Sequence, residues 1–214
     1  GTGNGILQTA LTGGGNLVVM RHDDTHLDLF RYDGNTLAPL NSGLELAGVD
    51  EGILGMVASA DGGIVVSRQV ADKFDLLRYN VDPDPGKPYY PNIGVERTGN
   101  GLASTDDGIL AMVATTSGHV VLLRQTGTAF DLLRYDTAPR SDTPGYPHII
   151  EVNRVVSAAG VDDGILAMVA TPDDHVVVAR QHQGQLDLLH YDTAPAEDHP
   201  NYPHIAEVNR LTSG

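Results

Sequence analysis

Ten residues, DDGILAMVAT, occur at 106–115 and again, unchanged, at 162–171. Related stretches are DEGILGMVAS at 50–59 and GNGILQTALT at 3–12. The glycines inside these stretches lie 47, 56 and 56 residues apart, at Gly5, Gly52, Gly108 and Gly164. Self-similarity at such periods is the sequence signature of a repeat architecture. The chain of 214 residues therefore reads as four copies of one unit.

Each copy contains four short runs that are typical of β-strands. In the third copy they are GILAMVAT (108–115), HVVLLRQ (119–125), FDLLRYD (130–136) and HIIEVNRV (148–155). The runs are rich in Val, Ile, Leu and Tyr and are bounded by Gly, Asp, Pro or Thr. A helix is the competing interpretation for the first run, but that run is too short and lacks a 3.6-residue continuation. Four meanders of four strands are predicted.

An arginine and an aspartate recur at fixed places in the second and third runs. Arg68 and Asp75 lie symmetrically about Ala71-Asp72, so a two-residue turn would place them opposite each other. The other copies repeat this spacing, with Arg21 and Asp28, Arg124 and Asp131, and Arg180 and Asp187. We interpret these pairs as cross-strand ion pairs of the scaffold.

Four such meanders predict a single all-β domain over residues 1–214, a four-bladed β-propeller with pseudo-fourfold repetition. The expected blades are approximately 3–49, 50–105, 106–161 and 162–214. Joining Gly214 to Gly1 would continue the repeat in phase, which favours a closed ring. In blade count and meander the chain resembles four-bladed propellers of hemopexin-like architecture. It carries neither the WD dipeptide nor an aspartate-box pattern.

The net charge of −15, from 28 acidic and 13 basic residues, argues against nucleic acid and anionic membrane surfaces as partners. No apolar run approaches the roughly 18 residues of a membrane span. The chain has no cysteine, which excludes disulfides and thiolate chemistry. Cellular location and oligomeric state do not follow from the sequence.

An acidic pair precedes the first strand in three copies: Asp50-Glu51, Asp106-Asp107 and Asp162-Asp163. In a ring these pairs would converge near the axis, and carboxylate oxygens suit calcium. The resemblance to four-bladed propellers, which often hold an ion in the channel, also implies a divalent cation such as calcium. The candidate ligands are Asn4, Glu51, Asp107 and Asp163. The alternative is that acid and glycine only form turns.

A proline-rich loop between the third and fourth strands ends in Tyr-Pro-His or Tyr-Pro-Asn in three copies. Tyrosine offers a flat face and a hydroxyl, and proline stiffens the loop. The candidate ligand-binding residues are Tyr90, Asn92, Tyr146, His148, Tyr202 and His204. Repeated sites favour a binding module for a small molecule or glycan, with carbohydrate as the ligand class. The alternative is that the loop covers an edge strand.

Histidines that break the repeat suggest another function, a cofactor-independent enzyme of lyase, isomerase or cyclase type. An enzyme needs an asymmetric site, and His190 replaces the arginine of the other copies. The acid–base candidates in this fourth copy are His182, His190, His199 and Asp198. The mouth of the channel is the other place for such a site. No organic cofactor is expected, because no dinucleotide or phosphate-binding fingerprint is present.

Overall fold

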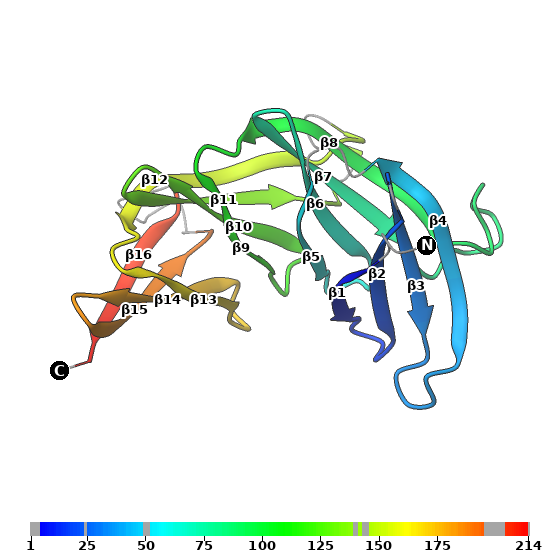
Figure 1. The fold of residues 1–214 in the computed structure, drawn as a ribbon, viewed down its shortest axis with the longest axis horizontal. Helices are drawn as coiled ribbons and strands as arrows, with labels where there is room; N and C mark the ends of the chain where they lie inside the picture. The colour runs from blue at the N-terminus through cyan, green and yellow to red at the C-terminus, as the bar shows by residue number, and fades with distance from the viewer. Residues whose placement is uncertain are drawn as a thin grey trace. The chain divides into compact units, whose positions relative to one another are not determined.

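The computed structural model describes residues 5–23, 25–48, 52–138, 141–142, 146–194 and 204–213 (Figure 1). Within these residues the chain consists of β-strands, turns and loops, with no helix. Four sheets of four antiparallel strands confirm the predicted all-β fold. We call the sheets blades 1 to 4 in chain order, and each is the meander of one blade of a four-bladed β-propeller.

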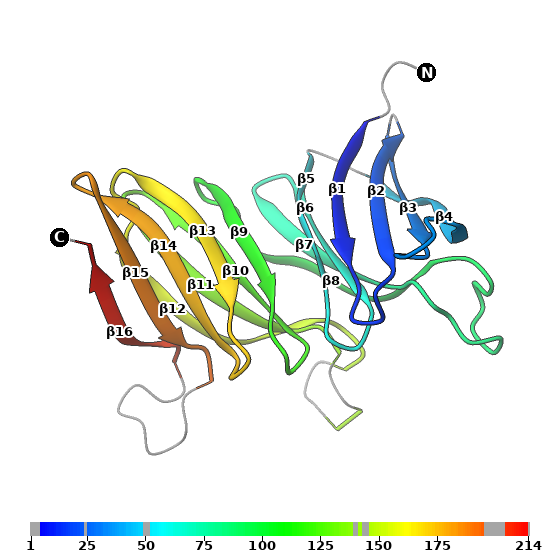
Figure 2. The same ribbon diagram turned by 90° about the horizontal axis from the view of Figure 1, so that it is seen from below.

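Strands that follow one another along the chain are neighbours in the sheet (Figure 1, Figure 2). Blade 1 contains β1 (Ile6–Leu11), β2 (Leu17–Asp23), β3 (His26–Tyr32) and β4 (Pro39–Gly48). Blade 2 contains β5 (Gly52–Ala58), β6 (Ile64–Val70), β7 (Lys73–Asn80) and β8 (Gly94–Ser104). Blade 3 contains β9 (Gly108–Ala114), β10 (His119–Thr126), β11 (Ala129–Asp136) and β12 (Ile150–Gly160). Blade 4 contains β13 (Gly164–Ala170), β14 (His175–His182), β15 (Gln185–Asp192) and β16 (Ala206–Thr212).

The central hairpin of each blade has the predicted register. Arg68 pairs with Asp75 across β6 and β7, and a turn at Ala71 (φ 54°) and Asp72 closes the hairpin. The register repeats in the other blades as Arg21 with Asp28, Arg124 with Asp131, and Arg180 with Asp187. The predicted cross-strand ion pairs are confirmed, with Arg68 Nη2 lying 3.0 Å from Asp75 Oδ2.

The same aspartate also binds the fourth strand of its blade. Asp75 Oδ1 accepts the N–H of Gly101 at 2.7 Å, and Asp131 Oδ1 accepts the N–H of Ser157 at 2.7 Å. Gly101 and Ser157 have φ of 57° and 50°, within an interruption of the regular pairing. One buried carboxylate therefore joins three strands, and we call this arrangement the Arg–Asp latch. Burial of a charged group is tolerated when it is paired in this way.

The chain divides into two compact units, Gly1–Ser104 with Pro139–Ile149, and Thr105–Ala138 with Ile150–Gly214. Unit 1 contains blades 1 and 2, whose facing side chains form one apolar core that includes Met20, Leu29, Met56 and Tyr79. Unit 2 contains blades 3 and 4 and has a separate core. In that core the rings of Phe130 and Tyr191 meet edge to face, with centroids 6.2 Å apart.

The backbone hydrogen-bond ladders between strands stay within each of the four sheets in the described part of the chain. Closure of the blades into a ring, and a single domain over the whole chain, stay predictions. The described residues contain no helix long and apolar enough to cross a membrane.

Candidate functional site

A pocket of about 560 Å³ lies in unit 1, where turns and strands of blades 1 and 2 come together. We call it the junction pocket. Its lining is mostly polar and comes from two tight turns, from β3, β7 and β8, and from the loop after β7. The lining residues are Thr12, Gly14, Asn16, Arg31, Ala60, Asp61, Gly62, Gly63, Arg78, Asn80, Val81, Asp82 and Glu96.

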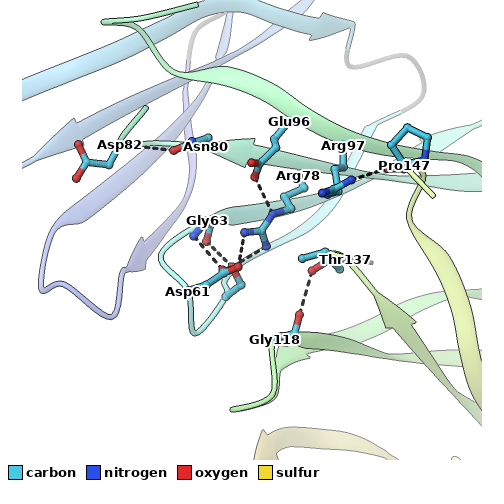
Figure 3. A network of polar contacts seen from close by, with 12 residues as sticks. Asp61, Gly63, Arg78, Asn80, Asp82, Glu96, Arg97, Gly118, Thr137 and Pro147 are labelled. Atoms are coloured by element: carbon cyan, nitrogen blue, oxygen red, sulfur yellow. Dashed lines mark hydrogen bonds and ion pairs between the residues drawn. The ribbon is translucent and has the colours of Figure 1, made fainter. Parts of the chain in front are cut away.

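Arg78 on β7 is the most densely bonded side chain of the pocket (Figure 3). Its Nη2 lies 2.6 Å from Asp61 Oδ2, and its Nε lies 3.1 Å from Glu96 Oε2. The guanidinium also donates to Ser59 Oγ at 3.1 Å. Burial alone would lower the pKa of Arg78, but the two carboxylates outweigh burial and raise it. Arg78 is therefore a fixed positive charge with its donors already directed.

Gly63 explains how this guanidinium fits against the turn that enters β6. A Cβ at Gly63 would lie 2.8 Å from Arg78 Nη2 and 3.1 Å from Ser59 Oγ. The corresponding positions of the other blades carry Asn16, His119 and His175. Only blade 2 therefore leaves this space free for an arginine side chain from its own third strand.

Arg31 on β3 is the second arginine of the pocket and crosses from blade 1 to blade 2. Its Nη1 lies 2.7 Å from Asp82 Oδ1 and donates to the carbonyl of Val81 at 3.2 Å. The amide oxygen of Asn16, when turned toward the guanidinium, accepts from Arg31 Nη2 at 2.7 Å. Like Arg78, Arg31 is neutralised by carboxylates of the chain itself.

The electrostatic balance of the pocket follows from these pairs. Burial alone would raise the pKa of Asp61, but hydrogen bonds from Arg78 and Ser59 lower it below its ordinary value. Two guanidinium groups face three carboxylates, those of Asp61, Asp82 and Glu96. The pocket therefore has no surplus of positive charge to attract an anion, but it offers many directed donors and acceptors.

The Tyr-Pro residues proposed from the sequence lie elsewhere. Tyr90 and Tyr146 are half exposed, and Asn92, His148 and His204 are exposed. None of these five lines the junction pocket. Tyr202 lies outside the described residues. Whether this set binds a ligand stays a prediction.

The chain that follows each Tyr-Pro step is anchored to a neighbouring strand. Ile93 and Ile149 are buried, and their N–H groups donate to Ser42 on β4 and Thr98 on β8. The ring of Tyr146 lies 5.2 Å from the guanidinium carbon of Arg97, whose Nη1 donates to the carbonyl of Pro147. These contacts favour the alternative that the loop covers the edge of a blade.

The described members of the proposed metal set, Asp107 and Asp163, are both engaged at hairpin turns. Asp107 Oδ2 accepts the N–H of Gly127 at 2.5 Å, and Asp163 Oδ2 accepts that of Gly184 at 3.2 Å. The described chain contains no group of three or more His, Cys, Asp or Glu side chains that could hold a metal ion. Asn4 and Glu51 lie outside the described residues, so a calcium ion in the channel stays a prediction.

The glycines after the acidic pairs have the conformation that turn chemistry requires. Gly108 and Gly164 have φ of 124° and 131°, in the region that favours glycine. The first acids of the pairs bind the latch arginines, with Asp106 Oδ2 lying 3.0 Å from Arg124 Nη1. The turn interpretation therefore accounts for both pairs that the structure describes.

The histidines of blade 4 lie in two places. His190 Nε2 is 3.0 Å from His175 Nδ1, and Asp192 Oδ1 lies 3.6 Å from the other nitrogen of His175. His182 Nδ1 is 2.9 Å from Asp162 Oδ2, without the geometry of a hydrogen bond. The other two candidates, His199 and Asp198, lie outside the described residues. An enzymatic role for these groups stays a prediction.

Sequence reasoning missed the junction pocket, although one signal pointed to it. One repeat position carries a large basic or imidazole side chain in every copy, and the sequence pattern draws attention only to the change at His190; the four residues are Arg31, Arg78, Arg134 and His190. The residues that distinguish blade 2 are Asp61 and Glu96, whose counterparts in the other blades carry no charge except Asp173. Charges that depart from the repeat, at Asp61 and Glu96, are the signal of this pocket in the sequence.

No family model and no curated protein matches this sequence. Among solved structures, a puromycin hydrolase S511A mutant complexed with PGG is similar over 87% of this chain, with 17% identity and a TM-score of 0.45. A PQQ-bound aldose sugar dehydrogenase from Streptomyces coelicolor is similar over 98% of this chain, with 15% identity and a TM-score of 0.49. The chain spans 27% of the length of the hydrolase and 72% of that of the dehydrogenase.

Proposed function

We propose that the chain is a ligand-binding module and that the junction pocket binds a neutral carbohydrate. The observation that carries this proposal is the pairing of Arg31 and Arg78 with carboxylates inside a pocket of about 560 Å³. This volume falls in the range of small-molecule sites. Because the guanidinium charges are already balanced, a neutral ligand avoids the cost of displacing an ion pair.

Hydroxyl groups are the ligand groups that match this lining. Each hydroxyl can donate to a carboxylate and also accept from a guanidinium or an amide. Asp82 and Glu96 present acceptors, Arg31 presents donors, and Asn80 presents both. None of the described lining residues is aromatic, so recognition would depend on hydrogen bonds and not on stacking.

The test is a titration of the protein with a panel of neutral mono- and oligosaccharides, by calorimetry or ligand-observed NMR. We expect at least one saccharide to bind. We expect Asn80→Ala and Asp82→Ala each to weaken its binding by about tenfold, because each variant loses a hydrogen bond worth about 1.4 kcal/mol. The side chain of Asp82 is 76% exposed, so its removal should leave the fold intact.

Asp136→Ala is the matched control for Asn80→Ala. Asn80 Oδ1 accepts the N–H of Asp82 at 3.0 Å, and Asp136 Oδ1 accepts that of Ala138 at 2.9 Å. Both substitutions remove the same turn contact, but only Asn80 lines the pocket. The assignment is wrong if no neutral saccharide binds, or if the Asn80→Ala/Asp82→Ala double variant binds as well as the parent.

A further inference from the structure

Arg134 in unit 2 occupies the repeat position of Arg31 and Arg78, but its surroundings are different. It lies on β11 and is 8% exposed. Its Nη1 donates to the carbonyl of Thr193 at 3.4 Å, and its Nη2 lies 3.1 Å from His119 Nδ1 and 3.5 Å from Ser117 Oγ. These partners are all formally neutral oxygens or an imidazole nitrogen.

No carboxylate lies within ion-pair distance of Arg134 in the part of the chain that the structure describes. Its Nε is buried and has no hydrogen-bond partner. A buried donor without a partner costs free energy, and a buried charge without a counter-ion costs more. Arg134 is therefore a site where an added acceptor with a negative charge would be stabilising.

The repeat shows which partners this arginine lacks. Arg78 is bound by Asp61 and Glu96, and the corresponding residues of blade 3 are Ser117 and Val152. Arg31 is bound by Asp82 of the next blade, and the corresponding residue of blade 4 is Ala194. In unit 1 the chain supplies a carboxylate to an arginine from three repeat positions. Around Arg134 all three of these positions carry uncharged residues.

The acidic side chains nearest to Arg134 have other partners. Asp174 accepts from Thr116 Oγ1 at 2.6 Å and from the N–H of Ser117 at 2.9 Å. Asp136 and Asp192 each accept the N–H of the residue two positions later. These three carboxylates attract the charge of Arg134 only at longer range, and none of them accepts a hydrogen bond from its Nε.

The pKa shifts of Arg134 and His119 agree with this description. Burial lowers the pKa of Arg134, and the longer-range carboxylates offset only part of that effect. Burial and the nearby guanidinium both lower the pKa of His119. A neutral His119 can accept a hydrogen bond from Arg134 at Nδ1, so it holds the guanidinium without neutralising it.

We propose that Arg134 is a binding site for the carboxylate group of a small acidic ligand. The carboxylate would take the place that Glu96 takes at Arg78, where the acceptor lies 3.1 Å from Nε. Val152 occupies the corresponding strand position and is 40% exposed, so this position is open to solutes. A carboxylate suits the site because its two oxygens match the fork of guanidinium donors. The proposal does not depend on carbohydrate binding in unit 1.

The first experiment follows the arginine Nε–Hε resonances by NMR while sodium acetate or sodium glucuronate is added, with sodium chloride at equal ionic strength as reference. Arg134→Lys assigns its signal. We expect a saturable shift of the Arg134 resonance in the millimolar range, with the Arg78 resonance unmoved because Glu96 already binds its Nε. The absence of a saturable shift, or an equal shift with chloride, would overturn the proposal.

The second experiment supplies the missing carboxylate from the chain with Val152→Glu. We expect the Arg134 resonance to move without added ligand, and acetate affinity to fall by about tenfold or more because the site is already filled. Val208→Glu is the matched control, since Val208 has the same place in blade 4, where the third strand carries His190. Unchanged acetate binding in Val152→Glu, with a folded protein, would contradict the assignment.

Discussion

Asp75 shows how much of a blade can depend on a single side chain. It is 4% exposed, its Oδ2 binds Arg68, and its Oδ1 binds the N–H of Gly101. Arg68 in turn donates to the carbonyl of Gly48, at the end of the last strand of blade 1. Removing this carboxylate would break the buried ion pair with Arg68 and would leave the N–H of Gly101 without its acceptor.

We expect Asp75→Ala to lower the free energy of unfolding by about 3–5 kcal/mol, the cost of breaking a buried ion pair by removing one partner. Urea unfolding followed by circular dichroism measures this loss. The control is Arg210→Ala, which removes an ion pair with Glu207 between side chains that are 43% and 30% exposed. That change should lower the free energy of unfolding by no more than about 1 kcal/mol, because an exposed ion pair contributes little. Equal losses in the two variants would refute the structural role of the latch.

The turns that join first and second strands also bind the two blades of unit 2 to each other. In unit 2, Asp174 lies in the turn between β13 and β14 and accepts from Thr116 and Ser117 in the turn between β9 and β10. Burial alone would raise the pKa of Asp174, but the hydrogen bonds from Ser117 and Thr116 lower it to about 2. The contact is therefore strongest when Asp174 is ionised.

This contact predicts a pH-dependent stability. Because the folded-state pKa lies below the ordinary value of 3.8, the contribution of Asp174 is complete above that value and is lost as the pH falls through about 2. Asp174→Asn should be less stable than the parent at about pH 6, and the difference should shrink toward pH 2. Thermal unfolding over this pH range measures the difference. Thr116→Ala should also lower the stability, but by less than Asp174→Asn. A difference that does not depend on pH would contradict the prediction.

The strands could be predicted from the sequence because each copy repeats the same local signals. The register at Arg68 and Asp75 followed from a two-residue turn between alternating apolar residues, which is a local rule. The contact between Asp174 and Thr116 could not be predicted, because it joins residues 58 positions apart in different blades. Which repeat positions meet across two blades depends on packing, and the repeat pattern alone does not contain it.

Each unit contains its own apolar core, and exposure varies strongly among the strands of a blade. Leu27 and Leu29 on β3 are fully buried, whereas Ile6 on β1 is 70% exposed and Leu211 on β16 is 64% exposed. Strands with few buried side chains open locally at a lower free-energy cost than strands in the core.

We therefore expect amide hydrogen exchange to be slowest in the central strands β2, β3, β6 and β7 of unit 1 and β10, β11, β14 and β15 of unit 2. Exchange should be fastest in β1 and β16, whose residues are mostly exposed. Exchange measured by mass spectrometry on peptides from each strand tests this order. Protection of β1 equal to that of β3 would show that a further surface covers it.

The limits of sequence reasoning are clearest at the scale of the whole molecule. Four copies give the number and type of blades, but ring closure concerns the placement of whole units, which no local pattern encodes. The proposed ion site depended on that placement, and Asp107 and Asp163 turned out to cap hairpin turns. The pocket is likewise built from residues of two blades, such as Arg31 and Asp82, so no single copy displays it.

The Arg–Asp latch and the position of Arg78 lie at opposite ends of the same hairpin, one beside its turn and the other at its open end. The ion pair that fastens each blade is thus separate, within every copy, from the position that we propose for ligand contact. A gene that duplicates such a module can change this position in one copy while the others keep theirs. Arg31, Arg78, Arg134 and His190 display three environments for arginine and one for histidine, a small repertoire from which new specificities could be selected one blade at a time.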